Sequence, residues 1–193
     1  MLKTQETTYP TGALTVGDKF PSFSLPACVS IDKNYFENFK QISLDDFKKK
    51  WKVIFFWPFD FTFICPTEII DFNKSYNEFR ERDAILLGIS CDSEHVHLAW
   101  RKHHPELKNL QFPMISDYKK KLAQELGILH KQTEAPLRAT YIVDPDNTIR
   151  SVYINDLSVG RNIKEVLRLL DAFQNGGLCP SCWEKGKDTL KVS

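Results

Sequence analysis

The residue with the clearest chemical potential in this chain is Cys65, because of the segments on either side of it. The apolar run at residues 53–57 predicts a buried strand, and the segment from Pro66 to about Arg82 predicts a helix. This order places Cys65 on a strand-to-helix turn, in or beside the first helical turn. Unpaired backbone N–H groups and the positive end of the helix dipole stabilise an anion there. We therefore expect Cys65 to act as a thiolate nucleophile.

Three neighbours strengthen this interpretation against the commoner role of a cysteine as a small buried apolar residue. Pro58 rigidifies the turn, and Thr62 lies where a turn could bring its hydroxyl to the sulfur or to a substrate oxygen. Glu68, one helical turn beyond Cys65, could orient an arginine. A thiolate that attacks an O–O bond needs such a cation and hydrogen-bond donors, because negative charge shifts onto the oxygens.

The second informative stretch is Cys179-Pro180-Ser181-Cys182-Trp183. A zinc site would need two more ligands, and the sequence contains no second CxxC pair. A thioredoxin-type CxxC centre would need a helix beginning at the first cysteine, whereas Cys179 follows the end of one. The third interpretation is a thiol that is carried to an oxidised Cys65 on an arm, which Gly176 and Gly177 lift away from the core.

The bulk properties limit the classes of function. The chain has 193 residues, enough for one domain, and a formal net charge of +1 that argues against nucleic acid as a partner. The N-terminal segment is polar, and the longest apolar run, residues 53–59, is too short to span a membrane. Five cysteines without a disulfide-scaffold pattern fit a reducing compartment. We expect a soluble, cytoplasmic protein without a membrane partner.

Strand-like and helix-like stretches alternate along the chain, which predicts an α/β fold with a central mixed sheet flanked by helices. The expected boundaries are residues 14–177 for the domain and residues 178–193 for an extended C-terminal arm. Cys28 and Cys91 are expected to pack as small apolar groups, and His95 and His97 to lie on a helix face. The strands are expected at residues 53–57, 84–90, 112–115, 139–143 and 148–154, the last two as a hairpin, and the helices at 66–82, 92–104, 119–126 and 162–175.

The pattern Pro58-x-x-x-Thr62-x-x-Cys65 resembles the signature of the peroxiredoxins. The resemblance extends from about Leu14 to Leu190 and is closest to the typical two-cysteine group, with the alkyl hydroperoxide reductase C branch nearest. The further matching segments are Ser90-x-Asp92-Ser93, His97-Leu98-Ala99-Trp100, Asp156-Leu157-Ser158-Val159-Gly160-Arg161, and Cys179-Pro180 with Trp183.

This resemblance implies a thioredoxin-like fold and reduction of hydrogen peroxide and alkyl hydroperoxides without a metal, haem or flavin cofactor. Cys65 would be the peroxidatic cysteine, which peroxide oxidises to a sulfenic acid. Pro58 and Thr62 would shape the pocket, and Arg138 would occupy the family's arginine position. In a supporting role, Arg161 would pair with Glu68.

The resemblance also implies that Cys179 is the resolving cysteine and forms an intersubunit disulfide with Cys65 in an antiparallel homodimer. Cys182 departs from the family pattern, and it could be an alternative resolving cysteine or relay the disulfide as Cys179–Cys182. Relatives commonly assemble into rings of five or six dimers. The reductant could be thioredoxin, a flavoprotein reductase or an AhpD-like adaptor.

Two other classes of function compete with the peroxidase. One is a redox-switched chaperone or signalling protein, which is also a possible secondary role. The other is a disulfide oxidoreductase centred on Cys179 and Cys182.

Overall fold

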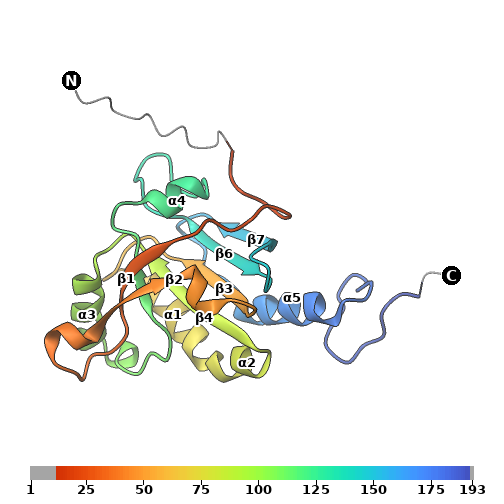
Figure 1. Cartoon of the computed structure of the whole chain (residues 1–193), viewed down its shortest axis with the longest axis horizontal. Helices are drawn as coiled ribbons and strands as arrows, with labels where there is room; N and C mark the ends of the chain where they lie inside the picture. Colours follow the sequence, from red (N-terminus) through yellow and green to blue (C-terminus); the bar gives the residue numbers. More distant parts are fainter. Residues whose placement is uncertain (1–11, 192–193) are drawn as a thin grey trace.

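The computed structural model describes residues 12–191, which form a seven-stranded mixed sheet with helices against both faces (Figure 1). The strand order is β2-β1-β5-β4-β3-β6-β7, and the central strands β3, β4 and β5 are parallel. The other pairs are antiparallel. The strands are β1 (Ser24–Cys28), β2 (Phe39–Ser43), β3 (Trp51–Phe56), β4 (Ala84–Ser90), β5 (Met114–Ser116), β6 (Arg138–Val143) and β7 (Ile149–Asn155).

The helices cover two separate apolar cores. Val53 and Phe55 of β3 face the core that contains Phe72 and Leu170, whereas Ile54 and Phe56 face the core that contains Leu122. Both sides of β3 are therefore buried, as the continuous apolar run predicts. Within the described residues, no helix is long and apolar enough to cross a membrane. The helices are α1 (Ile64–Lys74), α2 (Tyr76–Glu81), α3 (Glu94–His103), α4 (Lys121–Glu125) and α5 (Ile163–Asn175), with short 3₁₀ turns at Tyr35–Asn38, Leu44–Phe47 and Pro105–Leu107.

Most of the expected elements are confirmed, including the β6–β7 hairpin. The expected single helix over residues 66–82 is wrong, because the chain leaves helical geometry at Ser75 (φ −89°, ψ 6°) between α1 and α2. Serine competes for backbone hydrogen bonds and is a weak helix former, which fits an interruption there. Strands β1 and β2 were not predicted, because their sequences are short and mix polar with apolar residues.

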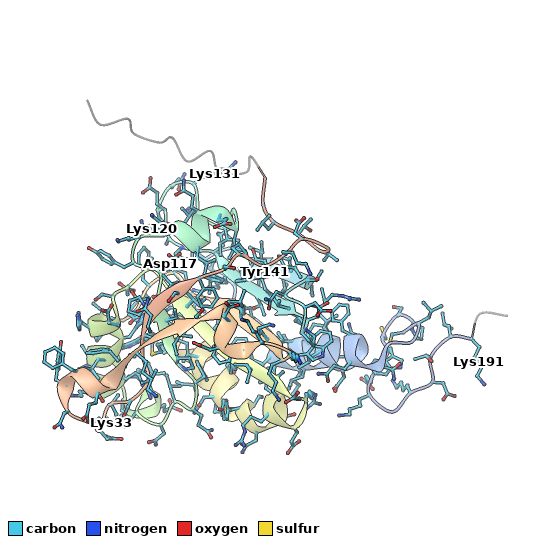
Figure 2. The ribbon with its side chains drawn as sticks, in the orientation of Figure 1. Lys33, Asp117, Lys120, Lys131, Tyr141 and Lys191 are labelled. Atoms are coloured by element: carbon cyan, nitrogen blue, oxygen red, sulfur yellow. The ribbon has the colours of Figure 1, made fainter. Side chains whose placement is uncertain are left out.

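The chain beyond α5 forms a loop at the far end of that helix, away from the sheet (Figure 1). In the side-chain view, Lys191 near its end lies far from Tyr141 in β6 (Figure 2). The backbone N–H of Leu190 donates to the carbonyl of Leu178 at 2.8 Å, so the base of the loop is closed. Its Trp183 is only 2% exposed, which an aperiodic segment does not predict.

Gly88 in β4 tests how tightly the core beneath α1 is packed. A Cβ at this position would lie 2.9 Å from Cζ of Phe55 and 3.0 Å from Cζ3 of Trp57, and both rings are buried. We expect Gly88→Ala to lower the free energy of unfolding by about 1–3 kcal/mol, measured by urea denaturation. Gly160→Ala is the control, since its added carbon would meet its nearest neighbour at 3.5 Å. Equal effects of the two substitutions would contradict this account.

Candidate active site

Cys65 lies in the first turn of α1, directly after the turn that follows β3. Its side chain is 1% exposed. The turn is tight, since Phe61 takes a left-handed conformation with φ of 55°. The location that the sequence predicts for Cys65 is therefore the location observed.

Arg138, the first residue of β6, directs its guanidinium at this sulfur. Its Nη1 donates to Sγ of Cys65 at 3.5 Å and to Oε2 of Glu68 at 2.6 Å. Its Nε donates to the carbonyl of Leu157 at 2.8 Å, which fixes the plane of the guanidinium. The side chain is only 4% exposed, so bulk water screens its charge weakly.

Arg161 holds the other side of the same carboxylate. Its Nε and Nη2 donate to the two oxygens of Glu68 at 2.7 and 3.0 Å, and its backbone N–H donates to Oε1 at 2.9 Å. Its Nη1 donates to the carbonyls of Phe56 and Ala139, which tie the guanidinium to β3 and β6. Burial lowers the pKa of Arg161 from its ordinary value, and the charge and hydrogen bonds of Glu68 oppose that shift.

The charges of this cluster do not balance while Cys65 carries its proton. Two buried guanidinium groups face one carboxylate, which leaves one positive charge uncompensated among Glu68, Arg138, Arg161 and the thiol. A buried charge without a partner is costly. A thiolate at Cys65 would supply the missing negative charge, and the cluster is therefore arranged to stabilise an anionic sulfur.

Pro58 and Thr62 lie in the turn before α1. Pro58 is buried, and its carbonyl accepts a hydrogen bond from Sγ of Cys91 at 3.4 Å. The hydroxyl of Thr62 donates to the carbonyl of Phe59 at 3.0 Å. Among the described residues it makes no hydrogen bond to Cys65, so in this conformation the structure does not join Thr62 directly to the sulfur.

A buried polar network supports this turn, and the sequence analysis missed it. The Asp60 carboxylate bonds to Nδ1 of His97 at 2.6 Å and accepts from Nε1 of Trp57 at 2.8 Å. The backbone N–H of Asp60 donates to Asp92 at 2.7 Å. His97 lies on α3, as expected for a helix-face residue, and it is fully buried there. The signal for its burial was its spacing, because His97 lies three residues before Trp100, a large side chain that is also buried.

The remaining cysteines fall into two groups, and none of the five thiols forms a disulfide. Cys28 and Cys91 are buried, as expected, and burial raises the pKa of each thiol, that of Cys91 to about 11. Cys179 is half-buried, with its thiol 3.8 Å from the carbonyl of Ala172. Cys182 is exposed, in a left-handed turn with φ of 54°.

No group of three or more His, Cys, Asp or Glu side chains that could hold a metal ion occurs within residues 12–191. The site is thus a buried thiol with two arginines and one carboxylate. The model of the AhpC/TSA family matches residues 16–152, which include Cys65 and Arg138. The chain belongs to the AhpC/TSA family.

Individual relatives agree with this assignment. The chain is 47% identical over 185 residues to the alkyl hydroperoxide reductase C of Mycolicibacterium smegmatis, covering 93% of this chain and 94% of the relative. The Mycobacterium bovis AhpC structure is 48% identical with a TM-score of 0.83, covering 90% of this chain and 100% of that chain. The reduced 2-Cys peroxiredoxin of Plasmodium vivax is 36% identical with a TM-score of 0.84, covering 93% and 94%. The protein is an AhpC-like peroxiredoxin and a thiol-dependent peroxidase with a thioredoxin-like fold.

Glu68 should stabilise this peroxiredoxin more than an ordinary charged residue does. Glu68→Gln removes the negative charge that two buried arginines share, and we expect it to lower the free energy of unfolding by about 3–5 kcal/mol. Urea denaturation measures the change. Asp71→Asn on the same helix is the control, because Asp71 pairs with Lys74 and is 58% exposed. That substitution should cost under about 1 kcal/mol, and a similar cost for both would contradict the shared-charge argument.

Proposed function

We propose that Cys65 is the peroxidatic cysteine of this enzyme and that Arg138 is its principal catalytic partner. The observation that carries the proposal is the 3.5 Å hydrogen bond from Nη1 of Arg138 to Sγ of Cys65, inside a cluster whose charge balances only with a thiolate. The thiolate attacks one peroxide oxygen, an S–O bond forms and the O–O bond breaks. The products are a Cys65 sulfenic acid and water or an alcohol, the leaving oxygen having taken up a proton.

Pro58 and Thr62 shape the approach to this sulfur. The buried Pro58 begins the turn, and the Thr62 hydroxyl, half-buried, is close enough in sequence to rotate from Phe59 to a bound peroxide oxygen. Glu68 and Arg161 are positioning residues, since they hold the Arg138 guanidinium rather than touch the sulfur. Hydrogen peroxide and small alkyl hydroperoxides are the proposed substrates.

Cys179 is the proposed resolving cysteine, on an arm formed by residues 178–193, outside the domain at 14–177. The partner's Cys179 attacks the sulfenic sulfur of Cys65, an S–S bond forms and hydroxide leaves to become water. Two features support delivery between subunits. The described part of the arm, residues 178–191, extends away from its own sheet (Figure 1), and β7 is a sheet-edge strand able to pair with a second copy of the chain. Such antiparallel dimers would then assemble into a ring of five or six dimers.

Cys182 is proposed to take over the disulfide and present it to a reductant. It is exposed, whereas Cys179 is half-buried, so a dithiol such as reduced thioredoxin, a flavoprotein reductase or an AhpD-like adaptor reaches Cys182 more easily. The reduction of this disulfide returns all three thiols to the start of the cycle, and a reducing cytoplasm would supply the electrons.

Single-turnover oxidation with one equivalent of hydrogen peroxide tests the assignment of the three cysteines. Wild type should first give a Cys65–Cys179 dimer on a non-reducing gel, which Cys182 then converts to a monomer. Cys65→Ser and Cys179→Ser should lose the dimer, and Cys182→Ser should accumulate it. Peptide mass identifies the bonded pair. A monomeric Cys179–Cys182 product in the wild type would demonstrate the relay. Peroxide consumption that persists in Cys65→Ser would refute the assignment. A protein that acts only as a chaperone would instead keep its chaperone activity in Cys65→Ser.

Arg138→Gln tests the role of the guanidinium separately. We expect the second-order rate constant for Cys65 oxidation to fall about 10²- to 10³-fold, since the variant loses charge stabilisation aimed at the reacting atoms. Rapid-quench trapping of reduced Cys65 measures it. Arg150→Gln on β7 is the control, because Arg150 is 47% exposed and pairs with Asp144. A loss below tenfold in Arg138→Gln would contradict the proposal.

A further inference from the structure

The loop that carries Cys179 and Cys182 is a closed structure with its own internal bonds. Its base is joined by the Leu178–Leu190 hydrogen bond, and Thr189 packs so near Gly177 that a Cβ there would lie 2.9 Å from its methyl carbon. At the centre of the loop, Nε1 of the buried Trp183 donates to the carbonyl of Lys187 at 2.9 Å. The loop is thus a folded unit that packs against α5.

Three residues on one face of α5 hold this unit, at positions i, i+3 and i+4. Nη1 of Arg168 donates to the carbonyl of Trp183 at 3.0 Å. Asp171 pairs with Lys185 at 3.4 Å, and the carbonyl of Ala172 accepts from the Cys179 thiol at 3.8 Å.

These three contacts differ in strength. Lys185 is 67% exposed, so its pair with Asp171 contributes little. A thiol is a weak donor, so the contact of Cys179 with Ala172 is also weak. The Arg168 contact is charge-assisted, and Arg168 is held in place by two hydrogen bonds to the Glu165 carboxylate at 2.7 and 2.8 Å. It is the main polar anchor of the loop among the described residues.

The pKa of Arg168 is raised from its ordinary value, chiefly by the hydrogen bonds to Glu165. Its contact with the loop is at Trp183, the residue directly after Cys182. The anchor therefore acts on the segment that carries the two cysteines, not on the distant end of the arm.

The docked loop cannot by itself complete the reaction. Cys65 is 1% exposed, and the Cys179 thiol faces the carbonyl of Ala172 in its own subunit. A disulfide requires the two sulfurs to come within about 2.05 Å. The Cys179 loop must therefore leave α5 before it can meet the sulfenic acid of another subunit, and the bond from Arg168 to Trp183 opposes that departure.

We propose that Arg168, oriented by Glu165, is a positioning residue that sets the rate of the resolving step by holding the Cys179 loop on α5. This inference rests on the proposed resolving role of Cys179. When the anchor opens, Cys179 attacks the sulfenic sulfur, and the S–S bond and water form as described above. While it stays closed, Cys65 sulfenic acid persists and a second peroxide can oxidise it to sulfinic acid.

The test compares Arg168→Gln with Lys164→Gln as the control. Lys164 is an exposed residue of the same helix, and it forms no ion pair with the loop among the described residues. Disulfide formation after one equivalent of peroxide is followed by rapid quench and non-reducing gel. Arg168→Gln should form the Cys65–Cys179 bond about tenfold faster, as loss of one charge-assisted hydrogen bond predicts. Lys164→Gln should form the bond at the wild-type rate. Arg168→Lys keeps one charged donor, so its rate should lie between those of the wild type and Arg168→Gln.

Two further measurements separate this role from general destabilisation. The rate of the first step at Cys65 should stay unchanged in Arg168→Gln, and the sulfinic acid fraction at excess peroxide should fall. In the reduced variant, amide hydrogen exchange should accelerate at residues 178–190 but not in the sheet. Resolution at the wild-type rate or slower in Arg168→Gln would overturn the anchor, whereas absence of any Cys65–Cys179 disulfide in Cys182→Ser, which cannot pass the bond on, would refute the resolving role itself.

Discussion

The position of the Glu68 carboxylate is the constraint on which the site depends. It is 4% exposed and accepts four hydrogen bonds, three from Arg161 and one from Arg138. Arg161 in turn donates to the carbonyls of β3 and β6. The first turn of α1 is thereby fixed relative to the sheet, and the distance between Cys65 and Arg138 follows from it. A buried network of this kind is stable only when every member has its partner.

The sequence indicated the part of the site that lies on local structure. An apolar run followed by a proline-containing turn and a helical segment placed Cys65 at the start of a helix, and the strands expected at residues 139–143 and 148–154 form the β6–β7 hairpin. Local signals of this type predict the structure correctly because the residues that carry the signal are also the residues that form the element and its cap. Arg138 and Arg161 could be identified as site residues only through the family motif, because their residue type and local sequence do not distinguish a site arginine from a surface arginine.

The rest depends on contacts between distant segments. The Asp60–His97 bond joins a turn to α3 across 37 positions of sequence, and no propensity or period encodes it. Strand β1 forms because β2 and β5 pair with its two edges, not because its own residues strongly favour a strand. Trp183 is buried although its segment has no periodicity, because Arg168 and the loop's own bonds hold it there. Tertiary contacts override local preference in each case.

Gly176 ends α5 in the left-handed conformation, with φ of 72° and open space where a Cβ would project. A Cβ at Gly176 would meet no heavy atom within 4 Å, while the loop that follows is closed by main-chain hydrogen bonding at its base. The loop can therefore move as a nearly rigid body about Gly176. The conformational entropy lost on reaching a second sulfur is then confined to a few dihedral angles. This raises the effective concentration of the Cys179 thiol at the Cys65 sulfur of a second subunit. Cys182 lies in the same loop, so it moves together with Cys179.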